Sequence, residues 1–311
     1  MNELSRRLFV RGAVGLATTL QLQRAAWALG FASAPDVCKL EAEQEVGPYY
    51  VANEMIRRDI RENKGGFPLA LDLLVLDSRT CKPLPYAAID VWHCDALGLY
   101  AGYTKNNPMD GDGPGGFGGP GVPGGPPPGF DPSHPGPPPG DHGPGGPPPN
   151  GMGGMQGPPA TDKLTFLRGI QFTDAEGRVS FQTVFPGFYQ GRTNHVHFKV
   201  RLGGHTGLAD SHRTYLVGHT SHVGQVFFPE EVSLDLMKQE PYASHKIHRT
   251  TIAEDGVYNG QHGDTSVSTL KFLEAGKPQS GMQAHMVVAV DPTATPAPAR
   301  REGGPPPPTQ G

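Results

Sequence analysis

The segment 111–160 restricts most strongly what this chain can fold into. It contains 19 Gly and 17 Pro among its fifty positions. Such a composition supplies too few apolar side chains for a packed core, so we expect a Gly/Pro-rich disordered insertion at the surface, biased toward polyproline II. A collagen helix is excluded because the glycines follow no Gly-X-Y register. A tolerated insertion is the simplest interpretation, with a lid or a partner-binding arm as alternatives.

The N-terminus has the layout of an export signal. Arg6 and Arg7 precede a short, weakly apolar run over 12–20, and two Ala-x-Ala patterns follow. These features predict a twin-arginine signal peptide over 1–34, read by the Tat export machinery. The alternative is a chance Arg-Arg pair in an ordinary amphipathic helix. Because the run is too short to span a bilayer, we expect a periplasmic or secreted protein without stable membrane insertion.

Short strands separated by turns dominate 35–292, which we expect to form one domain around the insertion. Helical periodicity is weak, and 230–238 is the one short helix that we predict. The stretch 174–177 looks like a hairpin turn. This pattern indicates an all-β fold, a β-sandwich or a barrel. Apolar or alternating runs predict strands at 69–77, 87–94, 170–173, 179–184, 195–202, 214–217, 225–228, 250–253 and 282–290.

The tail 293–311 is Pro-rich, like the insertion, and we expect it to be disordered. Without the leader, the insertion and the tail, about 200 residues remain, which suits a single domain. The formal net charge is -4 and no basic stripe occurs. Nucleic acid is therefore excluded as a partner, since phosphate binding requires clustered Lys and Arg.

Three cysteines stand at 38, 81 and 94. They are too few for a disulfide scaffold, and the absence of a CxxC spacing argues against a structural zinc site. An exported protein would form one disulfide and leave one thiol over. We favour Cys38 with Cys81, although the connectivity does not follow from sequence alone.

The sequence His195-Val196-His197 is the first candidate for chemistry. Side chains alternate along a strand, so the two imidazoles share one face while Val196, Phe198, Val200 and Leu202 form the core face. Two imidazoles placed in this way can bind one metal ion. The alternative is a pair of partly exposed histidines on a solvated face.

Two tyrosines, each next to a predicted strand, indicate which metal is involved. Tyr189 stands just before the strand, behind the Pro186-Gly187 turn, and Tyr100 lies just beyond the strand predicted at 87–94. A phenol ionises only near a pKa of about 10, but a bound trivalent cation favours the phenolate. Anionic oxygen combined with imidazole suits ferric iron better than zinc or magnesium.

In this order, the motifs resemble the intradiol ring-cleavage dioxygenases, and the exported branch more than the cytoplasmic catechol and protocatechuate enzymes. The resemblance covers roughly 38–228, apart from the insertion. It rests on Gly47 to Tyr50, on 90–96 with Gly98 and Tyr100, on 166–169, on Thr173, Asp174 and Gly177, on 186–189, and on Gly191-Arg192 leading to 195–197.

The resemblance implies a β-sandwich that holds non-haem Fe(III). It assigns the metal ligands as Tyr100, Tyr189, His195 and His197. Tyr189 would leave the metal when substrate binds and then serve as a base. Arg192 would stabilise negative charge on the reacting ring, and Gln225 would lie near that ring. The implied substrates are a small catechol-type aromatic diol and O2, and the product is a muconate-type dicarboxylic acid.

Two departures from the family pattern stand out. Asn194 occupies the position before His195, where the family leads us to expect proline. The helical N-terminal segment that mediates dimerisation in the cytoplasmic relatives is not recognisable, so the oligomeric state stays open. The sequence also does not specify which catechol is the substrate.

Two other functions compete with ring cleavage. One is an exported β-sandwich module that binds an aromatic compound or a surface polymer and carries a non-catalytic metal site. The presence of all four implied ligands argues against a relic site of this kind. The other is a copper or zinc protein built on His195 and His197, which the two tyrosines disfavour.

Overall fold

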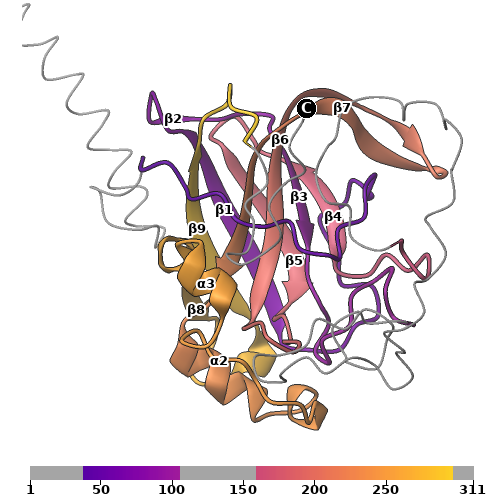
Figure 1. Ribbon diagram of the computed structural model, residues 1–311, viewed down its shortest axis with the longest axis vertical. Coiled ribbons are helices and arrows are strands. Elements are labelled where there is room, and N and C mark those ends of the chain that lie inside the picture. The colour runs from indigo at the N-terminus through magenta and orange to yellow at the C-terminus, as the bar shows by residue number, and fades with distance from the viewer. Residues whose placement is uncertain (1–37, 106–158, 297–311) are drawn as a thin grey trace, which may run out of the picture.

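The computed structural model describes residues 38–105 and 159–296 (Figure 1). The predicted signal peptide at 1–34, nearly all of the insertion at 111–160 and most of the tail at 293–311 lie outside the described residues. The described parts form two facing β-sheets, which confirms the predicted sandwich. No helix within 38–105 or 159–296 is long and apolar enough to cross a membrane.

The first sheet is built around β1 and β9, which run parallel to each other. Its path is β2-β1-β9-β8, and β5 pairs antiparallel with β1. The strands are β1 (Pro68–Asp77), β2 (Lys82–Pro83), β5 (Arg178–Val184), β8 (Thr269–Phe272) and β9 (Met282–Val290).

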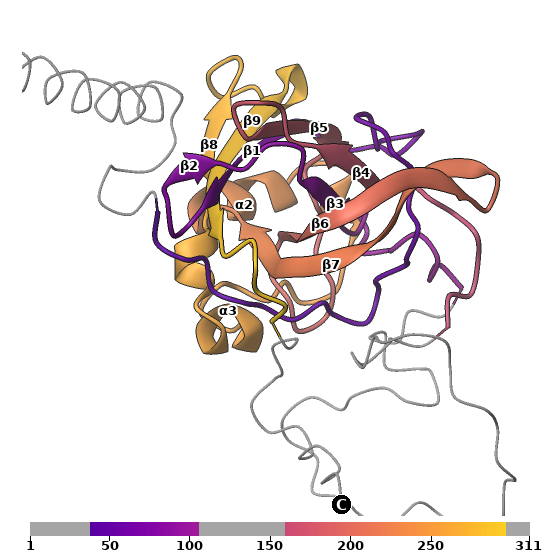
Figure 2. The same ribbon diagram turned by 90° about the horizontal axis from the view of Figure 1, so that it is seen from above.

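The second sheet is antiparallel throughout, in the order β4-β3-β6-β7. The far ends of β6 and β7 form a two-stranded ribbon that extends beyond the sandwich (Figure 2). The strands are β3 (Ala88–Trp92), β4 (Arg168–Phe172), β6 (His195–Ala209) and β7 (His212–Phe227).

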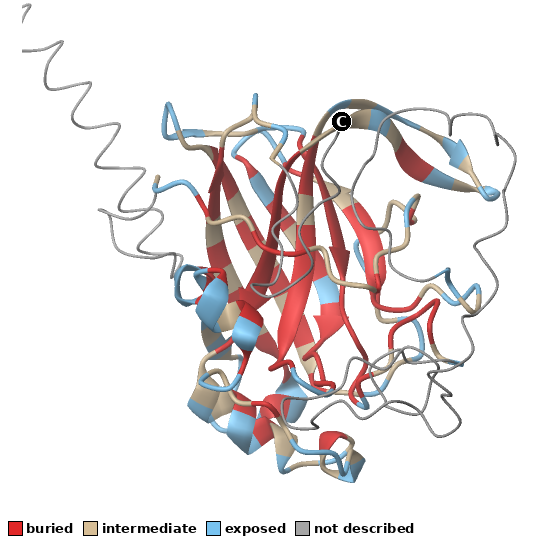
Figure 3. Cartoon of the chain, viewed as in Figure 1, coloured by how far each residue is buried: buried red, intermediate tan, exposed pale blue. Residues whose placement is uncertain are grey.

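The core lies between the two sheets, where the inward side chains of both meet (Figure 3). On β1 the alternation places Leu69, Leu71 and Leu73 inside. On β6 it places Val196 and Phe198 inside, as predicted. His195 and His197, which alternate with these residues, therefore face the other side of the second sheet, away from the apolar core.

Most predicted strands are present, but two expectations are wrong. The turn at 174–177 does not join a hairpin, because β4 pairs with β3 and β5 pairs with β1. It carries the chain from one sheet to the other. The stretch 250–253 is no strand, because the Glu254 carboxylate accepts hydrogen bonds from the backbone and the hydroxyl of Thr251 and closes a turn.

Further findings concern the number and length of the elements. The runs predicted at 214–217 and 225–228 fall in the single strand β7, which ends at Phe227. The predicted helix is present as α2 (Glu230–Met237). The short helix α3 (Gly256–Gly260) and strand β8 have no counterpart in the prediction.

The N-terminal segment 38–57 crosses from the first sheet to the second. Its start is joined to the turn after β1 by the disulfide Cys38–Cys81, which confirms the favoured pairing, and Cys94 is free and buried. Glu41 N then donates to Ala289 O of β9, and Gln44 N donates to Val223 O of β7. The segment thus covers the outer face of the second sheet, the face that carries the histidines.

Candidate metal centre

The two histidines of β6 converge on one point. His195 and His197 are buried, and their Nε2 atoms lie 3.1 Å apart. The Nδ1 atom of His195 donates to Thr193 O over 2.6 Å, which leaves the Nε2 lone pair available. Burial, with help from the Arg192 cation, lowers the pKa of His195 to about 3, and burial lowers the pKa of His197 well below its usual value. Both imidazoles are therefore neutral, the form that binds metals.

Stacking fixes the ring of His197. Trp92, its register partner on β3, stacks on it with centroids 5.0 Å apart and planes 3° apart. Gly47 of the N-terminal segment also approaches the ring so closely that a Cβ there would come within 3.1 Å of His197 Cε1. The imidazole thus has little freedom to turn, which preorganises it as a ligand.

The two tyrosines lie beside the histidines. The hydroxyl of Tyr189 is 3.5 Å from His195 Nε2, and its ring centroid is 5.7 Å from that of Tyr100. The Tyr100 hydroxyl is buried and has no hydrogen-bond partner among the described residues. Burial raises the pKa of Tyr189 to about 12 and raises the pKa of Tyr100 well above its usual value. Tyr49 stacks on Tyr100 with centroids 4.3 Å apart, and so holds the ring in place.

Two loops bring the tyrosines together from distant parts of the sequence. The loop after β3 carries Tyr100, and the loop before β6 carries Tyr189. They touch where Gly187 N donates to Asp95 O over 3.2 Å. A side chain at Gly187 would overlap that carbonyl oxygen, and one at Gly98 would overlap the Phe188 carbonyl. Only glycine fits at this contact, which explains the two glycines of the sequence motifs.

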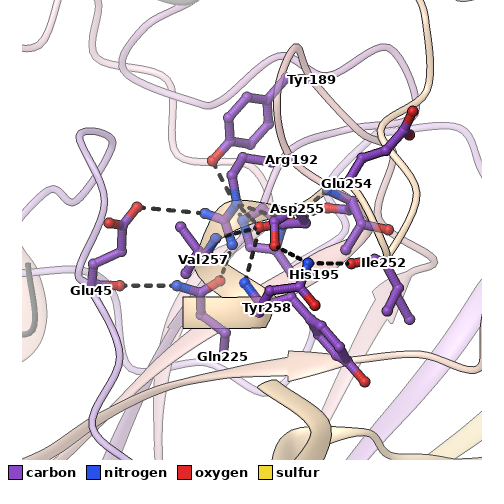
Figure 4. A network of polar contacts seen from close by, with 12 residues as sticks. Glu45, Tyr189, Arg192, His195, Gln225, Ile252, Glu254, Asp255, Val257 and Tyr258 are labelled. Carbon is purple, nitrogen blue, oxygen red and sulfur yellow. Dashed lines mark hydrogen bonds and ion pairs between the residues drawn. The ribbon is translucent and has the colours of Figure 1, made fainter. Parts of the chain in front are cut away.

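Arg192 is held by groups from three different segments (Figure 4). Its Nε lies 3.1 and 3.0 Å from the two carboxylate oxygens of Asp255, and its Nη2 donates to Gln225 Oε1. Its Nη1 makes no hydrogen bond within the described part of the chain, and Glu45 Oε1 lies 3.7 Å away. Gln225 Nε2 in turn donates to Glu45 O over 3.1 Å. The structure thus brings Arg192 and Gln225, both singled out in the sequence, into direct contact.

Asp255 is a residue of this network that the sequence reasoning missed. Burial would raise the pKa of Asp255, but the neighbouring Arg192 guanidinium and the Thr193 N–H hold that pKa below its usual value. Asp255 also caps α3 through the backbone N–H groups of Val257 and Tyr258. An Asp before a short helix is a typical N-cap, so the sequence could have suggested the cap but not its contact with Arg192.

Asn194 has a structural role that proline could not fill. Its amide Nδ2 donates to the carbonyls of Pro186 and Gly187, each over 2.9 Å. Its Oδ1 accepts from Arg249 over 2.8 and 3.0 Å. The side chain therefore fastens the loop of Tyr189 to the start of β6, and the departure from the family pattern leaves both histidines in position.

Arg168 supports the site from the opposite edge. It is buried, and it donates to the carbonyl of Tyr49, which stacks on Tyr100, and to the carbonyl of Ala101, which follows Tyr100 in the chain. Its ion pair with Glu54 spans 3.8 Å. Burial raises the pKa of Glu54 to about 8 despite that cation. This arrangement agrees with a structural rather than a reactive role for Arg168.

The donor set fits a ferric ion. The two Nε2 atoms lie 3.1 Å apart, so one cation could bind both imidazoles. A cation would also give the unpartnered Tyr100 hydroxyl a partner as phenolate. No cluster of three or more His, Cys, Asp or Glu that could hold a metal occurs among residues 38–105 and 159–296, so a site here depends on the tyrosines.

Dioxygenases are among the solved structures that this fold resembles. The intradiol ring-cleavage dioxygenase from Tetranychus urticae matches with a TM-score of 0.59 and 25% identity, over 83% of this chain and 98% of its own. A second dioxygenase matches with the same TM-score and identity, over 83% of this chain and 97% of its own. Catechol 1,2-dioxygenase from Pseudomonas arvilla C-1 matches with a TM-score of 0.44 and 18% identity, over 96% and 79%. No family model matches the sequence, and no curated protein is significantly similar to it.

The sandwich, its outer-face site and these matches define the class of protein. The resemblance to the intradiol ring-cleavage dioxygenases that the sequence motifs indicate is confirmed. The chain is an enzyme of this dioxygenase type, and therefore an oxidoreductase.

Proposed function

We propose that the protein uses non-haem Fe(III) to cleave a catechol-type ring between its two hydroxylated carbons. Both atoms of O2 enter the product, a muconate-type dicarboxylic acid, so no external reductant is consumed. The observation that carries the proposal is the convergence of two neutral imidazoles and two buried phenols. Tyr100, Tyr189, His195 and His197 would hold the iron.

The chain's own residues would perform most of the remaining work. Bound ferric iron would supply a centre that chelates the diol and makes its ring electron-rich. Tyr189 would take a proton from a substrate hydroxyl onto its phenolate oxygen. Burial raises the pKa of Tyr189 to about 12, so a released phenolate in this position is a strong base. Tyr100 would transfer no proton, and its stacking on Tyr49 would keep it in place.

Arg192 would stabilise charge in the transition state. Its guanidinium is buried and fixed on two nitrogens, while Nη1 makes no hydrogen bond to the described residues. A fixed cation in a buried site, with an N–H group that makes no hydrogen bond to the described residues, can stabilise negative charge on the ring oxygens without reorganising. Gln225 contacts Arg192 directly, so we assign it to orient the cation as well as to border the ring.

The test is a visible absorption spectrum of the purified protein without oxygen, before and after catechol is added. Ferric iron bound by phenolates should give a broad charge-transfer band, which catechol should shift to longer wavelength. Admitting oxygen should then bleach the shifted band as O2 is taken up. A band that shifts without oxygen uptake would instead support the alternative, an exported aromatic- or polymer-binding module with a non-catalytic metal site.

Variants sharpen this test. Tyr189→Phe and Tyr100→Phe should each change or remove the band. Tyr103→Phe is the matched control, since Tyr103 packs on Tyr49 in the same aromatic cluster but is not a proposed ligand. A protein that stays colourless after iron is supplied would overturn the assignment of both tyrosines.

We also propose that the Tat machinery exports the protein to the periplasm or beyond. The Arg6-Arg7 pair supports this proposal, and a disulfide between Cys38 and Cys81 suits an oxidising compartment. Replacing both arginines by lysine should leave the precursor uncleaved in the cytoplasm. Normal processing and export of that variant would contradict the proposal.

A further inference from the structure

We propose that Asp255 is a positioning residue, one carboxylate that fixes both the Arg192 guanidinium and the segment leading to His195. Its effect on ring cleavage rests on the proposed function, whereas its effect on Arg192 does not. Asp255 comes from the segment after α2, outside both sheets, and is fully buried.

The carboxylate is saturated with hydrogen bonds (Figure 4). Oδ1 accepts from Arg192 Nε, Val257 N and Tyr258 N, and Oδ2 accepts from Arg192 Nε and Thr193 N. The Thr193 bond is the shortest, at 2.8 Å. The helix N-terminus holds the carboxylate still, so the carboxylate can hold its two other partners still.

The first consequence concerns which nitrogen of Arg192 is left for a ligand. Asp255 binds Nε and Gln225 of β7 binds Nη2, so the plane of the guanidinium is fixed by two partners on separate elements. Nη1 is then the nitrogen without a hydrogen bond among the described residues. Loss of the Asp255 contact would let the planar group rotate and change which N–H group faces the site.

The second consequence concerns His195. Thr193 N donates to Asp255 Oδ2, and Thr193 O accepts from His195 Nδ1 over 2.6 Å. Thr193 is therefore fixed at its N–H by the carboxylate and fixes the imidazole with its carbonyl. A hydrogen-bonded partner behind a metal-binding histidine sets the ring orientation and tautomer, and here Asp255 acts one step further back.

Arg249, in the same segment, also supports the corner before β6 and can be compared with Asp255. Arg249 Nη2 binds Thr193 Oγ1 over 3.1 Å and Asn194 Oδ1 over 2.8 Å, and the Arg249 guanidinium pairs with both oxygens of Glu230. Arg249 thus holds the corner before β6 without touching Arg192. The contact with Arg192 is what distinguishes Asp255 from this scaffold.

The experiment compares Asp255→Asn with Asp255→Glu and with the control Asp235→Asn, which removes an exposed carboxylate of α2. Asp255→Asn should lower kcat by about 10- to 100-fold, as loss of an outer-shell partner does, and should weaken iron binding through Thr193 and His195, while the iron-loaded variant keeps the tyrosinate band. Asp255→Glu keeps the charge, so its kcat should lie between that of Asp255→Asn and that of the wild type. Asp235→Asn should keep wild-type kcat.

A double-mutant cycle with Arg192→Lys tests whether Asp255 acts through Arg192. We expect Asp255→Asn to reduce kcat much less in the Arg192→Lys background than in the wild type, because coupled residues are not additive. Additive losses, or a wild-type kcat in Asp255→Asn, would overturn the proposal. If Asp255→Asn does not fold, the cycle uses Asp255→Glu under the same criteria.

A readout without iron keeps this inference separate from the proposed function. In the iron-free protein, hydrogen exchange of the Arg192 Nε–H group, followed by NMR and assigned with Arg192→Lys, should be at least about tenfold faster in Asp255→Asn than in the wild type, since its charge-assisted partner is lost. Unchanged exchange would overturn the positioning role. A wild-type protein that gives no catechol-induced band would overturn only the proposed function.

Discussion

Buried ionisable side chains set the chemistry of this site at the scale of single residues. Burial keeps His195 and His197 neutral and makes the phenols of Tyr100 and Tyr189 reluctant to ionise without a cation. Arg192 remains charged although fully buried, because carboxylates surround it. The site therefore has two neutral imidazoles with lone pairs, two phenols that a metal ion could deprotonate, and the fixed Arg192 cation beside them.

We expect Arg192→Lys to lower kcat by about 10²- to 10³-fold, the usual effect of removing a preorganised electrostatic group. Lysine keeps the charge but loses the planar fork that contacts Asp255 and Gln225 at once. Steady-state oxygen uptake with catechol measures the loss. Arg178→Lys, on the exposed side of β5, is the control and should keep wild-type kcat. Equal rates in both variants would contradict the assigned role.

His93 makes the folded protein sensitive to acid. It is fully buried, its Nδ1 donates to Cys94 O and its Nε2 accepts from Thr183 Oγ1. Burial lowers the pKa of His93 to about 4, whereas an unfolded histidine has a pKa of about 6.5. Between these values the unfolded chain binds the extra proton, so the free energy of unfolding falls as pH drops, by up to about 1.4 kcal/mol per pH unit.

His93→Gln isolates this contribution. Urea unfolding of the iron-free protein at pH 7, 6 and 5 should show a smaller loss of stability for the variant than for the wild type, since glutamine does not titrate. Above pH 6.5 the difference between the two should be constant. Parallel pH profiles down to pH 5 would show that His93 is not the group responsible.

At the scale of elements, the site depends on where two loops touch. The loop after β3 and the loop before β6 meet through Gly98 and Gly187, and each carries one tyrosine to the histidines. Neither tyrosine lies on a strand, so the strands fix only the histidines. The relative position of the four side chains therefore rests on close backbone contact that a single methyl group would disturb.

Gly187→Ala should lower the free energy of unfolding by about 1–3 kcal/mol, the typical cost of overpacking. The added Cβ would overlap Asp95 O, and relief of the overlap would move Tyr189 relative to Tyr100. We therefore expect weaker iron binding and a weaker charge-transfer band, measured by metal analysis and absorbance. Gly65→Ala is the control, because no atom lies within 4 Å of its Cβ. A wild-type band in Gly187→Ala would show that the loops tolerate the shift.

At the scale of the whole molecule, one N-terminal segment connects both sheets and covers the site. It is joined to the turn after β1 by the disulfide, hydrogen-bonds to β9 and then to β7, and supplies Gly47 and Tyr49 against the proposed ligands. The sandwich core lies elsewhere, between the sheets. The site is therefore made by the packing of the N-terminal segment 38–57 and of loops onto the outer face of the second sheet.

Removal of the disulfide in a Cys38→Ser, Cys81→Ser double variant should lower stability by about 2–4 kcal/mol, because the bond restricts the unfolded chain over a separation of 43 residues. Denaturant unfolding without reductant measures this loss. Cys94→Ser serves as a comparison, since it removes a buried thiol that forms no disulfide. An unchanged midpoint in the double variant would mean that the hydrogen bonds of the segment suffice.

Local pattern determined most of the strands and the identity of the candidate ligands. The alternation of 195–202 predicts both the core face and the histidine face of β6, since a strand has a period of two that tertiary contacts do not change. The tyrosines, Arg192 and Gln225 follow from motifs spaced along the chain. Patterns of this kind do not predict pairing, so the turn at 174–177 suggests a hairpin although its strands enter different sheets.

The tertiary structure decided what surrounds those residues. Asp255 and the N-terminal segment reach the site over large sequence separations, such as the 63 residues between Arg192 and Asp255. No local periodicity marks such contacts, because they arise only when the loops fold onto the outer face of the second sheet. The sequence by itself thus determined the chemical types at the site, and the fold determined their partners, their burial and hence their charge states.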